Sequence, residues 1–333
     1  MGLELNKQKN GSFPGVKQSD KGKAAASETN SVPREPSDIR WIRTCLNLWP
    51  FKRGKGILLR LFGPRLRRRD FLIEIEPGVL IPGELDDWMV LSFFADARHN
   101  MPLQLSRSLI RRGDTLMDVG ANTGLWALGA ALRVGPEGAV HAFEPVPDNF
   151  ARLTRNLKLN GFTNVTCQKL ALSDKCGHTV FYAASDSNSG VGSLTQRGNT
   201  DRPIEIEITT VDDYCASHAI ARLDLMKVDV EGAELLVFRG AEHLLAAKEA
   251  PIIMFETDEV LTAHFGSSST MIKTLLHQYG YDFFRYTGKR LEAVAIKELH
   301  HKQEDLFALK PSHIERHQLL RQLCLSGDDN RVV

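Results

Sequence analysis

A glycine-rich turn is the first feature of this sequence that could carry chemistry. Residues 118–124 read Asp-Val-Gly-Ala-Asn-Thr-Gly and directly follow an apolar run. Glycine lets the backbone turn tightly and approach a ligand without a side-chain clash. Glu144 comes 24 residues after Gly120, at the end of a second apolar run, where a carboxylate can accept hydrogen bonds from both hydroxyls of a ribose. The spacing therefore predicts a site for a cofactor that contains a nucleoside.

The glycine spacing distinguishes between two classes of such cofactors. A dinucleotide needs the pattern G-x-G-x-x-G, so that its pyrophosphate can lie on a helix N-terminus. Here Asn122 occupies the second glycine position and Leu125 the third, which disfavours a nicotinamide-dependent oxidoreductase. The pattern from Asp118 to Gly124, acidic-x-Gly-x-x-x-Gly, is typical of methyltransferases, whose cofactor carries a cationic sulfonium and an amino acid. We therefore expect S-adenosyl-L-methionine, with Asp118 facing its amino group directly or through water.

Both carboxylates also have simpler explanations. Asp118 could merely cap backbone amides of the turn, and Glu144 could be a solvated residue at the end of a strand. The spacing between the turn and Glu144 favours the cofactor role for both residues.

A further group of acidic residues lies at 229–234, which reads Asp-Val-Glu-Gly-Ala-Glu. Alternation along a short turn would point Asp229 and Glu231 at the same cleft. These carboxylates could orient an acceptor hydroxyl, remove its proton or ligate a divalent cation. Favourable charge in the first turn of a helix is an alternative for Glu231 and is a sufficient explanation for Glu234. We predict catalytic roles for Asp229 and Glu231 and assign no metal.

Methyl transfer places only modest demands on a catalytic base. It is an in-line displacement at carbon, so most of the acceleration can come from holding sulfur, methyl and acceptor in line. A base near an acceptor hydroxyl would remove its proton as charge develops. His178 and His264 are further candidates for this base, although a lone histidine is more often structural.

The elements around these residues alternate between strands and helices. Strands are predicted at residues 116–119, 139–143, 165–171, 223–228 and 251–255, and helices at residues 127–133, 148–159 and 231–245. This alternation predicts a Rossmann-like α/β fold, with a mostly parallel sheet and helices on both faces. Ligands of such folds bind at the carboxyl ends of the strands, where Asp118, Glu144 and Asp229 all stand.

Five segments, taken in order, resemble the FkbM family of methyltransferases. They are residues 118–124, 142–145, 171–174, 223–234 and 239–241, within a match that spans about residues 114–285. The resemblance implies a class I methyltransferase fold with a seven-stranded sheet, S-adenosyl-L-methionine as the donor, and O-methylation of a sugar or secondary metabolite. By position it implies a set of cofactor-binding residues, the last two of which would enclose the adenine: Gly120, Ala121, Asn122, Gly124, Glu144, Leu172 and Ser173.

Composition divides the chain into four parts. Residues 1–38 are rich in Lys, Ser, Gly, Asn and Pro and are expected to be disordered, and residues 39–70 form a basic amphipathic lead-in. Residues 71–295 are expected to form the methyltransferase domain, and residues 296–333 a charged helical extension. The polar segment 185–193 could be a lid over the substrate or a plain hairpin turn.

Charge and cysteine usage limit the partners and the compartment. With 42 Lys and Arg against 41 Asp and Glu, the formal net charge is +1, so no nucleic-acid partner is expected and the acceptor should be a small molecule or a glycan. The basic lead-in could contact an anionic substrate or a membrane surface, but a solvated helix face is the favoured interpretation. Five widely spaced cysteines and the lack of an apolar N-terminal signal predict a cytoplasmic protein.

These features together predict an S-adenosylmethionine-dependent methyltransferase that acts on a hydroxyl oxygen. Among enzymes the main alternative is N-methylation, because the cofactor half of such folds is far more uniform than the acceptor half. A degenerate fold kept as a binding or scaffold module is an alternative from another class. Intact Gly120, Gly124, Glu144 and Asp229 disfavour it.

Overall fold

The computed structural model describes residues 35–48, 71–84, 90, 94, 101–183, 202–299 and 303–325. Most of the expected tail, much of the basic lead-in and the 185–193 segment lie outside these residues. Within the described part of the chain, no helix is both long enough and apolar enough to cross a bilayer.

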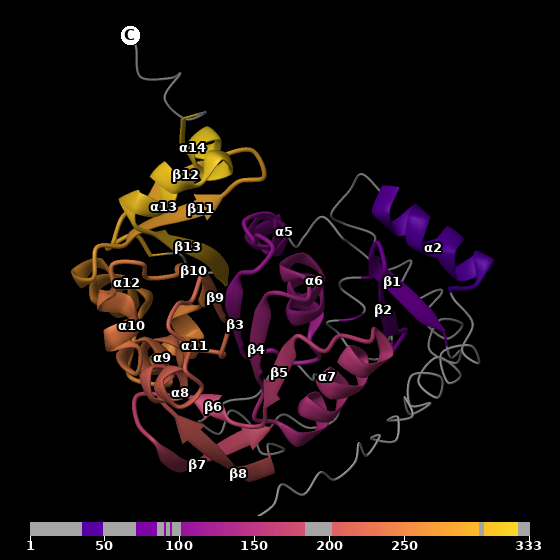
Figure 1. Cartoon of the computed structure of the whole chain (residues 1–333), viewed down its shortest axis with the longest axis horizontal. Coiled ribbons are helices and arrows are strands. Elements are labelled where there is room, and N and C mark those ends of the chain that lie inside the picture. Colours follow the sequence, from indigo (N-terminus) through magenta and orange to yellow (C-terminus); the bar gives the residue numbers. More distant parts are fainter. Residues whose placement is uncertain are drawn as a thin grey trace, which may run out of the picture.

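A mostly parallel sheet of eight strands forms the centre of the molecule (Figure 1). Its strands follow the spatial order β12-β11-β13-β10-β9-β3-β4-β5. The strands from β10 to β5 are parallel to one another, whereas β13 is antiparallel to both of its neighbours. Their bounds are β3 Thr115–Val119, β4 Ala139–Phe143, β5 Val165–Gln168, β9 Leu225–Val228, β10 Ile252–Thr257, β11 Asp282–Tyr286, β12 Leu291–Val294 and β13 Glu304–Leu309.

Helices cover both faces of this sheet, as the alternation predicts. One face is covered by α5 Met101–Ser108, α6 Leu125–Val134, α7 Pro147–Leu159 and α14 Gln318–Leu325. The other is covered by α8 Val211–Ser217, α9 Glu234–Arg239, α10 Glu242–Ala246 and α12 Ser269–Gln278 (Figure 1). Two further short helices are α11 Glu259–Ala263 and α13 Pro311–Arg316. The Rossmann-like α/β prediction is therefore confirmed.

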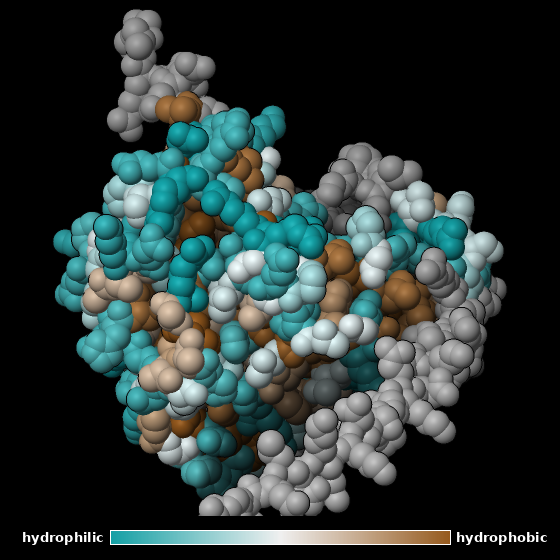
Figure 2. Space-filling model, viewed as in Figure 1, coloured by the Kyte–Doolittle hydropathy of each residue, from teal (hydrophilic) through white to brown (hydrophobic). Residues whose placement is uncertain are grey.

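Two small sheets stand beside the main one. The hairpin of β1 (Leu72–Glu76) and β2 (Val79–Pro82) packs with α2 (Ser37–Leu48) against the α6 side, where Ile39 and Ile81 are buried. A three-stranded sheet is formed by β6 Ala171–Leu172, β8 Arg202–Thr209 and β7 Gly177–Ala183. On the face drawn in Figure 2, hydrophilic residues surround small groups of hydrophobic ones.

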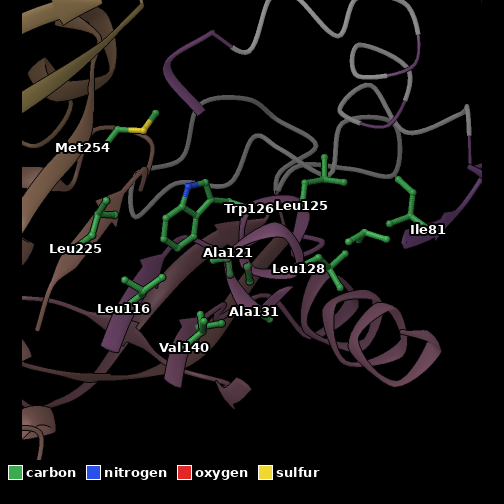
Figure 3. Close-up of a cluster of buried hydrophobic side chains, with 14 of the residues drawn as sticks. Ile81, Leu116, Ala121, Leu125, Trp126, Leu128, Ala131, Val140, Leu225 and Met254 are labelled. Atoms are coloured by element: carbon green, nitrogen blue, oxygen red, sulfur yellow. The ribbon is translucent and has the colours of Figure 1, made fainter. Parts of the chain in front are cut away.

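Strand alternation divides the core into two layers. Successive side chains of a strand point to opposite faces, and in β3 the buried Leu116 joins the layer under α6 while its neighbour Met117 joins the layer under α9. Figure 3 shows the first layer, in which Leu116, Val140 and Leu225 lie beneath Trp126 of α6. All four residues of β9 are buried, as expected for a parallel strand covered on both faces.

The predicted helix over 231–245 is two short helices in the structure. The chain bends at Gly240, between α9 and α10, where it runs against the backbone of Ser173. A Cβ atom on Gly240 would lie 2.0 Å from the Ser173 carbonyl oxygen. This close approach requires glycine at the bend.

The C-terminal part of the sheet also differs from the expectation. Residues 304–309 form β13, which lies between β10 and β11 inside the sheet, so the segment 296–333 is not a purely helical extension. The helices α13 and α14 follow this strand. The sheet has eight strands where the resemblance implies seven, because β12 pairs with the outer side of β11.

A buried hydrogen bond links Tyr281, just before β11, to Pro251, just before β10. Its hydroxyl donates to the Pro251 carbonyl oxygen at 2.8 Å, and the side chain is fully buried. Tyr281→Phe should lower the free energy of unfolding by about 1–3 kcal/mol, since a buried carbonyl loses its donor. Tyr279→Phe is the matched control, because Tyr279 is only partly buried. Chemical denaturation of both variants measures the difference, and equal losses would contradict the assignment.

Candidate functional site

The site lies on one face of the sheet, at the carboxyl ends of neighbouring parallel strands. Asp118 of β3 pairs in register with Lys227 of β9. Because residues two apart along a strand share a face, Asp118 and Lys227 stand one step beyond Leu116 and Leu225 of the apolar core. The next positions on that face, in order across the sheet, are Glu144, Gly120, Asp229 and Glu256. Strand register therefore produces a row of carboxylates that is interrupted by a glycine.

The turn after β3 contains three residues in left-handed conformations and packs closely against the end of β9. Gly120 has φ of 79°, and a Cβ atom there would lie 1.9 Å from the Asp229 carbonyl oxygen. Asn122 has φ of 51° and Gly124 has φ of 87°. The backbone amides of Gly120 and Ala121 both donate to the Phe143 carbonyl oxygen, at 3.1 and 2.9 Å. The turn is thereby fixed to the end of β4, next to Glu144.

Glu144 is buried and is bound to the turn. Its Oε2 accepts from the backbone N–H of Asn122 at 2.8 Å, and its Oε1 accepts from that of Val146 at 2.9 Å. Each carboxylate oxygen keeps a lone pair for a further donor. Burial raises the pKa of Glu144 to about 7, although the two backbone hydrogen bonds oppose the rise. The expected neighbourhood of turn and carboxylate is present.

Asp118 is fully buried below the turn. Neither of its carboxylate oxygens has a hydrogen-bond partner among the described residues, and the ammonium of Lys227 lies 3.5 Å from Oδ1. Burial raises the pKa of Asp118, the charge of Lys227 partly offsets this rise, and the charge of Asp229 adds to it. A buried carboxylate without hydrogen bonds is costly, so this position suits a ligand that carries a cationic amino group.

Lys227 is a buried cation between two carboxylates. Its side chain is 8% exposed, and its Nζ lies 3.1 Å from Asp229 Oδ2 as well as 3.5 Å from Asp118 Oδ1. Burial acts to lower the pKa of Lys227, but the charges of Asp229 and Asp118 more than offset this effect, so the pKa is raised. The ammonium is therefore charged at neutral pH.

Three carboxylates gather at the Asp229 end of this row. Carboxylate oxygens of Asp229, Glu231 and Glu256 lie within 4.8 Å of one another. A divalent cation could fit this spacing, but such groups also occur without an ion, and we assign none. Burial raises the pKa of Glu256 well above its ordinary value, and the charges of Asp229 and Glu231 add to the rise. Glu256 pairs across the sheet with Asp305, whose pKa burial and the charge of Asp229 raise to about 7.

The corner after β9 is stabilised by Glu234 from the first turn of α9. Its Oε1 accepts from the backbone N–H groups of Val230 and Gly232, both at 3.1 Å. Glu231, between them, has φ of 56°, a conformation that is uncommon for a residue with a side chain. The structure therefore gives Glu234 a local structural role and places Glu231 beside Asp229, as the sequence suggested.

The predicted adenine residues lie in a different setting. Leu172 is buried in the core layer on the opposite face of the sheet, and the backbone N–H of Ser173 donates to the Thr209 carbonyl oxygen at 2.8 Å. Their contact with adenine stays a prediction. His178 and His264 are absent from the three-carboxylate group, and their role as a base also stays a prediction.

Lys227 is the main site residue that the sequence reasoning missed. The signal was available, because Lys227 lies two residues before Asp229 in a run predicted to be a buried strand. A lysine in such a strand needs a buried partner on its own face. Asp305 gave no comparable signal, since its contribution depends on the pairing of β13 with β10.

The chain is similar in sequence to known methyltransferases. It is 32% identical over 161 residues to the 31-O-demethyl-FK506 methyltransferase FkbM of Streptomyces tacrolimicus, over 40% of this chain and 61% of the relative. It is 31% identical over 140 residues to the hexuronic acid methyltransferase AglP of Haloferax volcanii, over 42% and 55%. The crystal structure of the methyltransferase FkbM from Methylobacillus flagellatus aligns at 14% identity with a TM-score of 0.37, over 66% of this chain and 54% of that one.

The family assignment comes from the domain itself. The chain spans less than two thirds of the length of the two curated relatives above. The family model of the methyltransferase FkbM domain matches residues 118–283, from Asp118 of the turn to Phe283 in β11. The resemblance seen in the sequence is thus confirmed, and through these residues the chain belongs to the FkbM methyltransferase family.

Proposed function

We propose that this chain transfers a methyl group from S-adenosyl-L-methionine to a hydroxyl oxygen of a sugar or a secondary metabolite. The observation that carries the proposal is the buried Asp118, whose oxygens lack hydrogen bonds from the described residues, beside a turn bound to Glu144. Together they offer an acceptor for an amino group and an acceptor for a ribose within an FkbM domain.

The chain's own residues would hold the cofactor as follows. The turn from Gly120 to Gly124 would line the cofactor, Glu144 would accept hydrogen bonds from its ribose hydroxyls, and Asp118 would accept from its amino group. When bound, the cofactor supplies a methyl group activated on a cationic sulfonium. We further propose that Leu172 and Ser173 enclose the adenine, as the family pattern implies.

The acceptor side is where Asp229 and Glu231 would act. A carboxylate near the acceptor oxygen can take up its proton as the methyl group is transferred. Glu256 brings a third carboxylate to this position, with oxygens in reach of both. Because its pKa is raised, Glu256 binds a proton more readily than an ordinary glutamate. It would therefore keep the acceptor's proton after Asp229 or Glu231 has taken it up.

The names of two relatives support the proposed acceptor class, and the free thiols support the proposed compartment. One relative is named for a 31-O-demethyl compound and another for a hexuronic acid, which supports oxygen as the acceptor atom and polyhydroxylated molecules as acceptors. All five cysteines are free thiols, which supports a reducing, cytoplasmic setting.

Removing the Glu144 carboxylate should weaken cofactor binding. We expect Glu144→Ala to lower the affinity for S-adenosylhomocysteine about 10- to 100-fold, equivalent to about 1.5–3 kcal/mol, because two ribose hydrogen bonds are lost. Glu137→Ala, at the exposed opposite end of β4, is the control and should bind normally. Isothermal titration calorimetry measures both. Lack of saturable binding by the unmodified chain would falsify the proposed function.

Cofactor affinity should also depend on pH. The pKa of Glu144 is about 7, and a protonated carboxyl offers the ribose hydroxyls fewer acceptor sites. Affinity for S-adenosylhomocysteine should therefore be constant above pH 7 and fall, by up to about tenfold per pH unit, below it. Glu144→Gln should remove this step and keep the low affinity. An unchanged step in Glu144→Gln would assign the titration to another group.

Loss of the acceptor-side carboxylates should slow transfer without weakening cofactor binding to the same degree. Glu231→Gln should reduce kcat by about 100-fold or more if Glu231 takes the proton. Glu242→Gln, exposed on α10, is the control. Formation of S-adenosylhomocysteine is followed with hexuronic acids and neutral hexoses as probes. Transfer to amine probes alone would contradict a hydroxyl acceptor.

A further inference from the structure

Lys227 joins the two halves of the site. We infer that Lys227 is a positioning residue, whose ammonium holds Asp118 ready for the amino group of the cofactor and fixes Asp229 on the acceptor side. The inference rests on the proposed function and adds to it a residue that contacts neither reacting atom.

The position of Lys227 follows from strand register. It is in register with Asp118 on β3 and lies two residues before Asp229 on its own strand. Its Nζ is 3.5 Å from Asp118 Oδ1 and 3.1 Å from Asp229 Oδ2. A single ammonium therefore bridges a cofactor-side and an acceptor-side carboxylate from adjacent strands.

The charge balance makes Asp118 dependent on this ammonium. Asp118 is fully buried, and neither of its carboxylate oxygens accepts a hydrogen bond from the described residues. Arg107 also attracts it, but that guanidinium is paired with Glu76 and donates to the Leu125 carbonyl oxygen. Without Lys227, a buried Asp118 would keep its proton to higher pH and would lose its charge attraction to the cofactor.

Other groups around Lys227 support the same conclusion. Asp305 adds a further negative charge near it, and Met254 is its neighbour in register on β10. Because the pKa of Lys227 is raised, the side chain remains protonated and is unsuited to accept a proton from a hydroxyl. Its role is electrostatic positioning.

Stability alone does not account for this lysine. Buried ion pairs contribute little net stability compared with apolar residues of similar size, and the adjoining positions in the core are apolar. A second buried lysine shows the structural alternative. Lys273 of α12 is 1% exposed and donates to the carbonyl oxygens of Ala295 and Glu298, with no carboxylate of the site among these acceptors.

A double-mutant cycle on S-adenosylhomocysteine affinity tests the inference. The unmodified chain, Lys227→Met, Asp118→Asn and the double variant are titrated by calorimetry. We expect each single variant to bind S-adenosylhomocysteine about 10- to 50-fold less tightly than the unmodified chain. The double variant should bind no less tightly than the single variant with the lower affinity, since Lys227 acts through Asp118. Lys227→Arg should recover part of the loss because it restores the positive charge.

The controls separate positioning from folding and from the proposed function. Lys273→Met should lower the melting temperature and leave the affinity unchanged. Losses that multiply in the double variant, or a Lys227→Met variant that binds normally, would overturn the inference and leave the proposed function intact. Lys227→Gln replaces Lys227→Met in the cycle if the latter does not fold. If the unmodified chain does not bind S-adenosylhomocysteine, the proposed function itself is wrong.

Discussion

One ammonium held between two carboxylates, at the centre of a parallel sheet, is the interaction on which the site depends. Parallel register puts Lys227 level with Asp118, and strand alternation puts Asp229 on the same face. Because the core beneath them is apolar, each of these buried charges depends on the others for its stabilisation. The glycine turn, hydrogen-bonded to Glu144, lies beside this charged centre. Fold and chemistry are therefore specified by the same register.

Much of the fold could be predicted from local patterns. Apolar runs followed by glycine turns and amphipathic helices gave β3, β4, β9, β10 and the helices α6 and α7 close to their observed bounds. The position of β13 could not be predicted, because its pairing with β10 and β11 joins residues far apart in the chain. The break at Gly240 was missed for a similar reason. It depends on the backbone of Ser173, which approaches from another part of the fold.

The site, too, has parts that local patterns predict and parts that depend on long-range pairing. Asp118, Glu144 and Asp229 follow strands in motifs of fixed spacing, so the sequence placed them at one edge of the sheet, and the structure does the same. Lys227 could have been found by asking what a lysine in a buried strand contacts. The approach of Glu256 to Asp229 and Glu231 could not be predicted from the sequence. It depends on the pairing of two strands and on the left-handed conformation of Glu231 at the corner after β9, which motif spacing does not reveal.

The insertion of β13 between β10 and β11 has a consequence for how the chain acquires its structure. β11 and β12 are made before β13, yet β11 reaches the rest of the sheet only through it. The strands of the sheet therefore cannot pair in chain order. The hairpin of β11 and β12 stays unpaired with the rest of the sheet, and the edge of β10 stays open, until β13 pairs with both. Such non-local closure slows folding and exposes unpaired strand edges meanwhile. Glu256, on that open edge, would meet Asp305 only when β13 pairs with β10.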